Sequence, residues 1–435
     1  MTQLSYVRTE MLPEQPPPPT EVGIIGWLRE NLFKGWHNTV LTILALLFIY
    51  LVLSVVIPWL ISPTWSAGSL NECREFLAAH GREGKFSGAC WGVIRDRWIQ
   101  LLFGFYPAEL YWRPILAFVL LAVALAPVLF GEYVPKKLIW FTALYPFVMP
   151  WLLWGGSIWT PLAVLVGFGI GYVVHDRVAA ATGTLAGVIA GTVAALIWWF
   201  VLAGLVSGWL QGLIPLAIEV VESRNFGGFM LSLTIGIVAI AISLPLGILL
   251  ALGRQSDLLI VKSLCVGFIE FIRGVPLITL LFVASTLLNI FMPPGTNFDI
   301  ILRVIIMATL FASAYMAEVI RGGLAALPKG QYEGAASLGL NYWQSQRLVI
   351  MPQALKISIP GIVSTFIGLF KDTTLVSIIG LLDPIGLSNA IRADSDWNGI
   401  VWELYGFIAA LFWIFCFGMS RYSMYLERKL QTGHR

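Results

Sequence analysis

Residues 331–340 read Gln-Tyr-Glu-Gly-Ala-Ala-Ser-Leu-Gly-Leu, and residues 349–352 read Val-Ile-Met-Pro. They belong to a polar segment, 325–352, that separates two apolar runs. The alanine-rich part predicts a short helix ending at Gly339, since glycine readily adopts the left-handed conformation found at helix ends. A second amphipathic stretch follows, and Pro352 favours the first turn of the next helix. Two short helices joined at a glycine form an exposed projection that can dock in a groove of another protein.

The chain around this segment is very apolar. Hydrophobic residues make up 58% of its 435 residues and charged residues only 12%. A soluble domain is typically about 25% charged, and a soluble fold of this length has too little interior to hide so much apolar surface. The composition therefore predicts an all-α polytopic membrane protein. The net charge of +3 gives no indication of a nucleic-acid partner.

Ten runs of the sequence approach the roughly 20 apolar residues that a membrane-spanning helix needs. They are about 39–61, 114–130, 138–156, 160–174, 183–209, 229–252, 266–291, 301–320, 357–380 and 399–419. Pro146, Pro150 and Pro161 interrupt the third and fourth runs. The stretch 138–174 is therefore predicted either as one hairpin or as broken helices.

The distribution of basic residues predicts the orientation. An even number of spans places both chain ends on one side, and Lys and Arg concentrate on cytoplasmic loops. More of them fall on the side of the chain ends, which predicts both ends in the cytosol and the long loop 62–113 in the periplasm. Cys73 and Cys90 would then share an oxidising compartment, where they either form a disulfide or remain free thiols. The cysteine spacing indicates no metal site.

The chain divides near residue 225. We predict a cytosolic N-terminal tail at 1–38, an N-terminal transmembrane extension at 39–225 and a working core at 226–430. An interfacial helix is expected at 213–222, where the two halves join. Most of the ionisable residues within spans lie in the second half, and such groups are costly in a membrane and usually functional.

The segment 325–352 resembles the EAA loop of ABC importer permeases, whose pattern is Glu-Ala-Ala, three residues, Gly, nine residues, Ile-x-Leu-Pro. The matching residues are Glu333, Gly334, Ala335, Gly339, Val349, Met351 and Pro352. Three of these residues depart from the pattern by small or conservative changes: Gly334 stands for Ala, Val349 for Ile and Met351 for Leu. In that family the loop is the coupling helix seated on a cytosolic ATPase. We therefore name 325–352 the coupling segment and assign contact with the ATPase to Glu333, Gly334, Ala335, Ala336 and Gly339.

Three further stretches, Phe271–Leu277, Ala317–Gly323 and Lys371–Leu375, resemble signatures of the polar-amino-acid (His/Glu/Gln/Arg/opine) permeases. The long N-terminal half, with Phe105–Arg113, resembles the M-type permease subunit of the general L-amino-acid transporter (Aap or Bzt type). The resemblance covers nearly the whole chain. It implies a five-helix type I ABC importer core in residues 226–430 and a place in a bacterial inner membrane.

The resemblance also implies partners. They are a homologous second permease that forms a heterodimer, two copies of a cytosolic ABC ATPase, a periplasmic amino-acid-binding protein and the L-amino acid substrate. No Gly-x-x-x-x-Gly-Lys-Ser/Thr loop occurs in the sequence. We therefore expect the chain to be no enzyme and to hold no cofactor, with ATP and Mg bound by the partner ATPase.

Four residues are candidates for the substrate pathway. A zwitterionic amino acid needs partners of both signs, placed away from bulk water. Lys371 and Asp372 can supply both charges, and Thr373 and Thr374 can add hydroxyl contacts. The alternative interpretation is a Lys–Asp pair that only holds helices together.

Two acid–base pairs have a spacing of three residues, which places both side chains on one helical face. We expect Glu270 and Arg273 to form a structural or gating ion pair near the start of a span. Glu318 and Arg321 precede the coupling segment, and we expect them to brace it.

Two other functions are weighed against an importer. An ion-coupled secondary amino-acid transporter would need paired broken helices in related halves, and the two halves of this sequence look unalike. A membrane-embedded enzyme would need clustered His, Asp or Glu residues within spans, and the sequence contains no such cluster. The sequence therefore predicts a permease subunit that works by alternating access and is driven by a separate ATPase.

Overall fold

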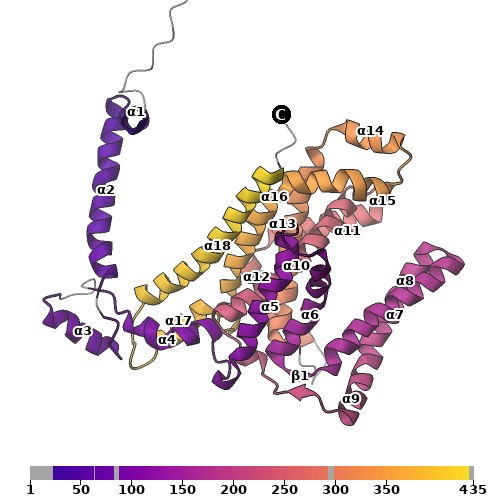
Figure 1. Cartoon of the computed structure of the whole chain (residues 1–435), viewed down its shortest axis with the longest axis horizontal. Coiled ribbons are helices and arrows are strands. Elements are labelled where there is room, and N and C mark those ends of the chain that lie inside the picture. Colours follow the sequence, from indigo (N-terminus) through magenta and orange to yellow (C-terminus); the bar gives the residue numbers. More distant parts are fainter. Residues whose placement is uncertain (1–22, 63, 83–87, 292–297, 431–435) are drawn as a thin grey trace, which may run out of the picture. The chain divides into compact units, whose positions relative to one another are not determined.

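The computed structural model describes residues 23–62, 64–82, 88–291 and 298–430. Its contacts divide the chain into two compact units, Met1–Val93 and Ile94–Arg435 (Figure 1). Of the cytosolic tail predicted at 1–38, residues 1–22 lie outside the described part. A short helix, α1 (Gly23–Asn31), follows them.

The first unit contains one long apolar helix. α2 (Trp36–Leu60) has no buried residue, and it is long and apolar enough to cross a membrane. A helix that is apolar on every side suits a lipid environment. α3 (Leu70–Ala79) follows it and begins at Ser69, whose hydroxyl accepts a hydrogen bond from the Glu72 amide.

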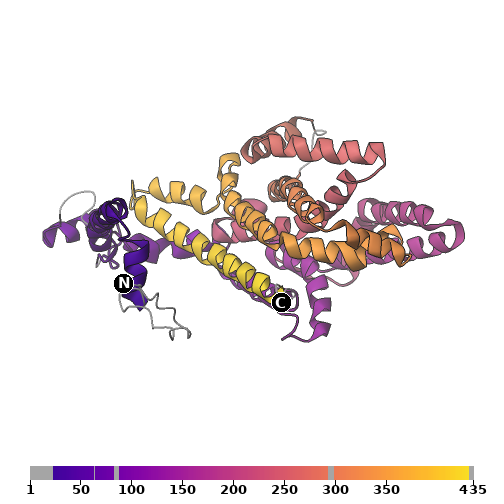
Figure 2. The ribbon, with the colours of Figure 1, turned by 90° about the horizontal axis from the view of Figure 1, so that it is seen from above.

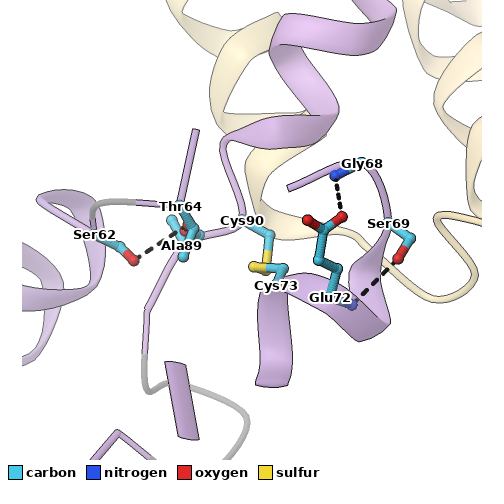
Figure 3. Close-up of a disulfide and its surroundings, with 8 residues drawn as sticks. All are labelled: Ser62, Thr64, Gly68, Ser69, Glu72, Cys73, Ala89 and Cys90. Atoms are coloured by element: carbon cyan, nitrogen blue, oxygen red, sulfur yellow. Dashed lines mark hydrogen bonds between the residues drawn. A yellow bond between two sulfur atoms is a disulfide. The ribbon is translucent and has the colours of Figure 1, made fainter. Parts of the chain in front are cut away.

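A disulfide closes the segment that follows α2. Cys73 on α3 is bonded to Cys90, and both residues are buried (Figure 3). The Thr64 hydroxyl donates a hydrogen bond to the Ala89 carbonyl, and the Ala89 amide donates to the Trp59 carbonyl at 2.9 Å. The bond joins residues 17 apart, a separation for which chain entropy predicts roughly 3 kcal/mol of stabilisation.

The second unit begins with the remainder of the N-terminal half. Its elements, with η marking short 3₁₀ or π turns, are α4 (Gly92–Phe103), η1 (Ala108–Leu110), α5 (Trp112–Leu129), η2 (Lys136–Leu138), α6 (Ile139–Trp154), β1 (Gly156–Ser157), α7 (Trp159–Thr182), α8 (Thr184–Ile197), η3 (Trp198–Leu202), α9 (Ala203–Leu213), β2 (Ala217–Ile218) and η4 (Ser223–Asn225). α7 and α8 can approach closely because Gly191 has no side chain: a Cβ there would lie 2.6 Å from the Gly171 carbonyl oxygen.

The C-terminal half completes the second unit. Its elements are α10 (Gly228–Arg254), α11 (Leu259–Gly274), α12 (Leu277–Phe291), α13 (Ile300–Ala325), α14 (Lys329–Ser337), α15 (Tyr342–Ser345), η5 (Gln346–Ile350), α16 (Met351–Asp372), η6 (Thr373–Ile379), α17 (Pro384–Arg392) and α18 (Trp402–Leu430). α18 is one long helix that lies beside α16 (Figures 1 and 2). We call the end that carries α14 the inner end and the opposite end the outer end, following the predicted orientation.

Helix α13 is the centre of this core. Ala308, Ala312, Met316 and Ile320 recur every four residues, so they form one stripe along the helix, and each is at most 4% exposed. Small residues let its neighbours approach. A Cβ on Gly247 of α10 would lie 2.6 Å from the Met316 Cγ. In the middle of the bundle, the Met316 side chain of α13 therefore packs directly against the backbone of α10 at Gly247.

The number of spans differs from the prediction. The described part of the chain has eight helices long and apolar enough to cross a membrane, or nine if the bent pair α11 and α12 is one span. The run predicted at 138–156 forms α6, whose 16 residues rise only about 24 Å at 1.5 Å per residue. The run predicted at 266–291 is broken by a bend of 101°. Pro276 lies two residues after the end of α11, and proline ends a helix because it lacks an amide donor.

The prediction of an interfacial helix at 213–222 is wrong. α9 ends at Leu213, and β2 pairs with β1 in an antiparallel two-residue ladder. Pro215 disfavours a continued helix because it fixes φ and lacks the amide hydrogen. The Arg113 guanidinium then donates to the Glu219 carbonyl oxygen at 2.6 Å, which fixes the extended path into the second half.

Three backbone segments cross at the outer end of α10. Gly104, after α4, pairs with Phe226, and Gly227 pairs with Leu382 ahead of α17. A Cβ on Gly104 would lie 2.4 Å from the Gly227 Cα, and one on Gly227 would lie 2.8 Å from the Leu382 carbonyl oxygen. The Gly228 amide donates to the same Leu382 carbonyl at 2.7 Å. We call Gly104, Gly227 and Leu382 the glycine crossing; it fastens the N-terminal half to the core.

The disulfide predicts a cysteine-labelling pattern. After denaturation without reductant, two of the four cysteines, Cys265 and Cys416, should react with a polyethylene-glycol maleimide, and all four should react after reduction. Gel shifts count the labels. Cys73→Ser should give three labels under both conditions. Four labels without reductant would contradict the bond.

The glycine crossing predicts a destabilised variant. Gly104 has φ of 68°, so Gly104→Ala combines left-handed strain with a backbone clash and should cost at least about 2 kcal/mol. The apparent melting temperature of the detergent-purified protein should fall. The control is Gly208→Ala on α9, where no atom lies within 4 Å and the higher helix propensity of alanine favours folding. Equal melting temperatures for the two variants would refute the crossing.

Candidate functional site

The coupling segment folds into two short helices joined at Gly339. This residue has φ of 70°, and its amide donates to the Ala336 carbonyl at 2.9 Å. The Leu340 amide reaches the Ala335 carbonyl at 3.3 Å. These two bonds form a Schellman ending, in which a left-handed glycine satisfies the last carbonyls of a helix. The turn is therefore fixed by the backbone and requires glycine.

One face of the coupling segment is open. Glu333, Gly334 and Ala336 are exposed, whereas Ala335 is only 2% exposed and packs inward. Large apolar side chains of the coupling segment are also exposed: Leu338 at 78%, Trp343 at 67% and Leu348 at 64%. An exposed apolar surface rimmed by polar residues is typical of a protein interface.

The same segment is joined rigidly to α16. Asn341 and Gln344 form a capping box at the start of α15, each side chain bonding the other residue's amide. α15, η5 and α16 then follow one another without a break. The Gln353 amide group on α16 donates to Gln331 Oε1 on α14 at 2.9 Å. Both the chain itself and this hydrogen bond therefore join α14 to α16.

A cluster of charges lies beside the inner end of α13, with Glu318 at its centre. Arg254 Nη1 lies 2.7 Å from Glu318 Oε1, and Arg321 Nη2 lies 3.0 Å from Glu318 Oε2. Arg273 Nη1 approaches the second oxygen at 3.6 Å. Three guanidinium groups thus surround one carboxylate whose side chain is 16% exposed. We call Arg254, Glu270, Arg273, Glu318 and Arg321 the inner charge cluster.

The cluster corrects one predicted pair. Glu318 pairs with Arg321 as the spacing indicates, but Glu270 contacts Arg254 at 2.9 Å instead of the expected Arg273. Arg273 turns to Glu318 and lies over the ring of Tyr315 at 5.6 Å. Spacing along one helix could not predict this, because Arg254 comes from the end of α10. The resulting contacts bind α10, α11 and α13 together.

The substrate-pathway candidates lie where α16 passes into η6. Lys371 is exposed, Asp372 is half-buried, and no ion pair joins them among the described residues. The Thr373 hydroxyl donates to the Phe370 carbonyl at 2.7 Å, and the Thr374 hydroxyl donates to the Lys371 carbonyl at 2.9 Å. Both hydroxyls therefore cap their own helix, and a role in binding substrate stays a prediction.

A cavity of about 1270 Å³ lies at the outer end, and Lys371 and Asp372 do not line it. Its wall includes a hydrogen-bonded chain that the sequence did not reveal. The Trp154 indole donates to the Ser223 hydroxyl at 2.7 Å, and that hydroxyl donates to the Asp299 carboxylate. Arg303 is 8% exposed and donates to the backbone carbonyls of Phe298 and Ser285. The Asp299 and Arg303 side chains of this wall are thus hydrogen-bonded within the protein.

Asp383 is fully buried at the start of α17. Its carboxylate accepts hydrogen bonds from the Gly386 amide at 3.0 Å and the Ile385 amide at 3.1 Å, which makes it the N-cap of this helix. Burial raises the pKa of this carboxyl to about 6, although the two amides act in the opposite direction. The structure thus gives Asp383 a role in holding the short helix that follows the glycine crossing.

Comparison with known proteins assigns the chain to a family. Residues 243–432 match the family described as the binding-protein-dependent transport system inner membrane component. The chain is 59% identical, over 100% of both sequences, to the glutamate/glutamine/aspartate/asparagine transport system permease protein BztC of Rhodobacter capsulatus. It is 39% identical, over 98% of this chain and 99% of the relative, to the inner membrane amino-acid ABC transporter permease protein YhdY of Escherichia coli.

A chain from the solved structure of an amino acid ABC transporter with histidines is 31% identical over 46% of this chain and 90% of its own length, with a TM-score of 0.41. The assignment itself comes from the two full-length relatives and from the family match in the C-terminal half. The chain therefore belongs to the family of amino-acid ABC transporter permeases, which are multi-pass proteins of the bacterial inner membrane.

Proposed function

We propose that this chain is one half of a heterodimeric amino-acid importer and that the coupling segment is its contact with the ATPase. Its partners are a homologous second permease, two copies of a cytosolic ABC ATPase that bind ATP and Mg, and a periplasmic amino-acid-binding protein. Because BztC is named for glutamate, glutamine, aspartate and asparagine, these four L-amino acids are the first substrates to test.

The single observation that carries the proposal is the shape of the coupling segment. Glu333 and Leu338 stand exposed on a projection that ends in a glycine turn, and the projection continues into α16. A free-standing apolar surface on a rigid arm is suited to be pushed by a partner. ATPase closure would move α14, and α16 would tilt with it.

Alternating access follows from this linkage. Tilting α16 moves Lys371 and Asp372, which lie at its far end, relative to α13. We place the pathway for the amino acid at this end of α16, with the two charges facing the carboxylate and ammonium groups of the substrate. A ligand shifts the balance between the two states only through its different affinity for them.

The inner charge cluster gives α13 a fixed partner during this movement. Glu318 accepts bonds from arginines of α10 and α13 and attracts Arg273 of α11, so three helices share one carboxylate. α13 ends at Ala325, directly before the coupling segment. We propose that the cluster braces the base of the segment, so that force from the ATPase reaches α16 and is not lost in bending α13.

The alternative function, ion-coupled secondary transport, predicts the opposite energy requirement. A secondary transporter takes up substrate from an ion gradient with this chain alone. The importer requires the ATPase and ATP. Uptake of L-glutamate into proteoliposomes that contain only this chain, without ATP, would therefore contradict the proposed function.

The coupling segment predicts an uncoupled variant. Gly339→Ala strains the left-handed turn and displaces the exposed face, and Glu333→Ala removes a side chain from it. In proteoliposomes with the complete transporter, L-glutamate import per ATP hydrolysed should fall about tenfold, within the range of 1–3 kcal/mol that typically couples two sites. The assay measures radiolabelled uptake and phosphate release in parallel.

The matched control for that variant is Gly330→Ala, an exposed glycine in α14 with no atom within 4 Å. It should import like the unaltered protein. If Gly339→Ala and Glu333→Ala also import normally, the coupling role of this segment is wrong.

The inner charge cluster predicts unequal effects of two similar substitutions. Glu318→Gln leaves three arginines facing one another around a 16% exposed side chain and should cost roughly 1–3 kcal/mol of stability. Glu270→Gln, at 54% exposure, should cost less than about 1 kcal/mol because water screens the pair. The melting temperatures of the purified variants test this order, and the reverse order would disprove the central place of Glu318.

A further inference from the structure

The second unit contains a set of polar contacts at the outer end that the importer function does not explain. They join α4, in the N-terminal half, to the loop between α17 and α18. The Trp397 indole donates to Asp96 Oδ2 at 3.1 Å, and Arg97 Nη2 donates to Asp394 Oδ2 at 3.0 Å. Arg97 Nε also lies 2.9 Å from Asp96 Oδ2. The residues on each side are about 300 apart in sequence, since the two contacts span 301 and 297 positions.

The contact is built around a buried aromatic ring. Trp397 is 0% exposed and is the largest fully buried side chain of the described residues. A buried indole needs a partner for its N–H, and Asp96 provides it. Arg97 and Asp394 are 26% and 31% exposed, and such an ion pair contributes at most about 1 kcal/mol. Burial of the ring therefore holds the contact, and the charges orient it.

The glycine crossing lies on the same path. α4 ends at Phe103, one residue before Gly104, and α17 begins at Pro384, two residues after Leu382. The segment around α17 is thus held at both ends. At Leu382 it pairs with Gly227, whose other neighbour is Gly104 of the N-terminal half, and at Asp394 and Trp397 the side chains of α4 hold it directly. The held segment is the direct continuation of α16 through η6.

Helix α16 is therefore attached at both of its ends. At the inner end it continues into the coupling segment, where Gln353 bonds Gln331. At the outer end it passes through η6 into the segment that α4 holds. A helix that is pushed at one end changes its tilt only if the other end has a support. Without the support, the whole helix would shift and the outer connection would yield.

We propose that Asp96, Arg97, Asp394 and Trp397 form an outer latch through which the N-terminal half anchors the outer end of α16. The four residues are positioning residues and do not contact the substrate. The N-terminal half is then more than an extra set of spans, because through the latch it supports the transport movement. The proposal rests on the proposed function, because it assigns the latch a part in converting ATPase movement into import.

The test uses the complete transporter in proteoliposomes and the variants Arg97→Gln, Asp394→Asn and Trp397→Phe. The first two remove the ion pair, and the third keeps an aromatic ring but removes the indole N–H. Glutamate import per ATP hydrolysed should fall about threefold, within the range expected for residues that couple distant sites. The ATPase rate and the amount of assembled complex should stay near those of the unaltered protein.

The matched control is Arg95→Gln. Arg95 is exposed, lies on the same helix and makes none of the latch contacts, so its removal changes the charge of α4 by the same amount. It should leave import per ATP unchanged. The double variant Arg97→Gln with Asp394→Asn should be no worse than either single variant, because both changes break one contact.

Two results would overturn the latch. One is import per ATP in the three variants equal to that of Arg95→Gln; the other is a defect in the double variant equal to the product of the two single defects. The proposed function fails separately, if the unaltered transporter imports glutamate without ATP. A loss of assembled complex in Arg97→Gln together with a normal import-to-ATP ratio in Trp397→Phe would also reject the proposal.

Discussion

The arrangement of the second unit depends on one steric constraint, the passage of three backbones at Gly104, Gly227 and Leu382. No Cβ fits at either glycine, because the facing atoms would lie 2.4–2.8 Å away. This contact starts α10 at a fixed point and joins the end of α4 to the outer end of the core. Phe226, next to it, is 1% exposed and stacks on Trp154, so the crossing is enclosed by aromatic rings.

The inner end is held by a different kind of interaction. Apolar residues pack closely along α13. At Glu318, on the same helix, the contacts with neighbouring helices include ion pairs. A carboxylate that three arginines share is directional, whereas apolar packing is not. Small residues still let the helices approach beside the charges, because a Cβ on Gly253 of α10 would lie 2.4 Å from the Cys265 sulfur of α11.

Helix α16 lies between these two fixed ends and connects them. The coupling segment continues into its inner end, and its outer end continues into the segment around α17. Several polar residues along this path bond to one another or to the backbone, as Gln353 does to Gln331 and Asp383 does to the first turn of α17. Such local satisfaction makes the segments stiff, and stiff segments transmit displacement.

The sequence by itself determined the membrane class, the coupling segment with its turn at Gly339, and the Glu318–Arg321 pair. These follow from composition, local backbone preferences and spacing along one helix, which act over a few residues. Only the tertiary structure decided that Glu270 contacts Arg254, that α11 and α12 are bent apart, that Pro215 is followed by a strand, and that Trp397 meets Asp96. Pro276 and Pro215 mark helix ends locally, but the contacts of Glu270 and Trp397 join residues of different elements. The energy of such contacts is set by three-dimensional packing that no local pattern of residues encodes.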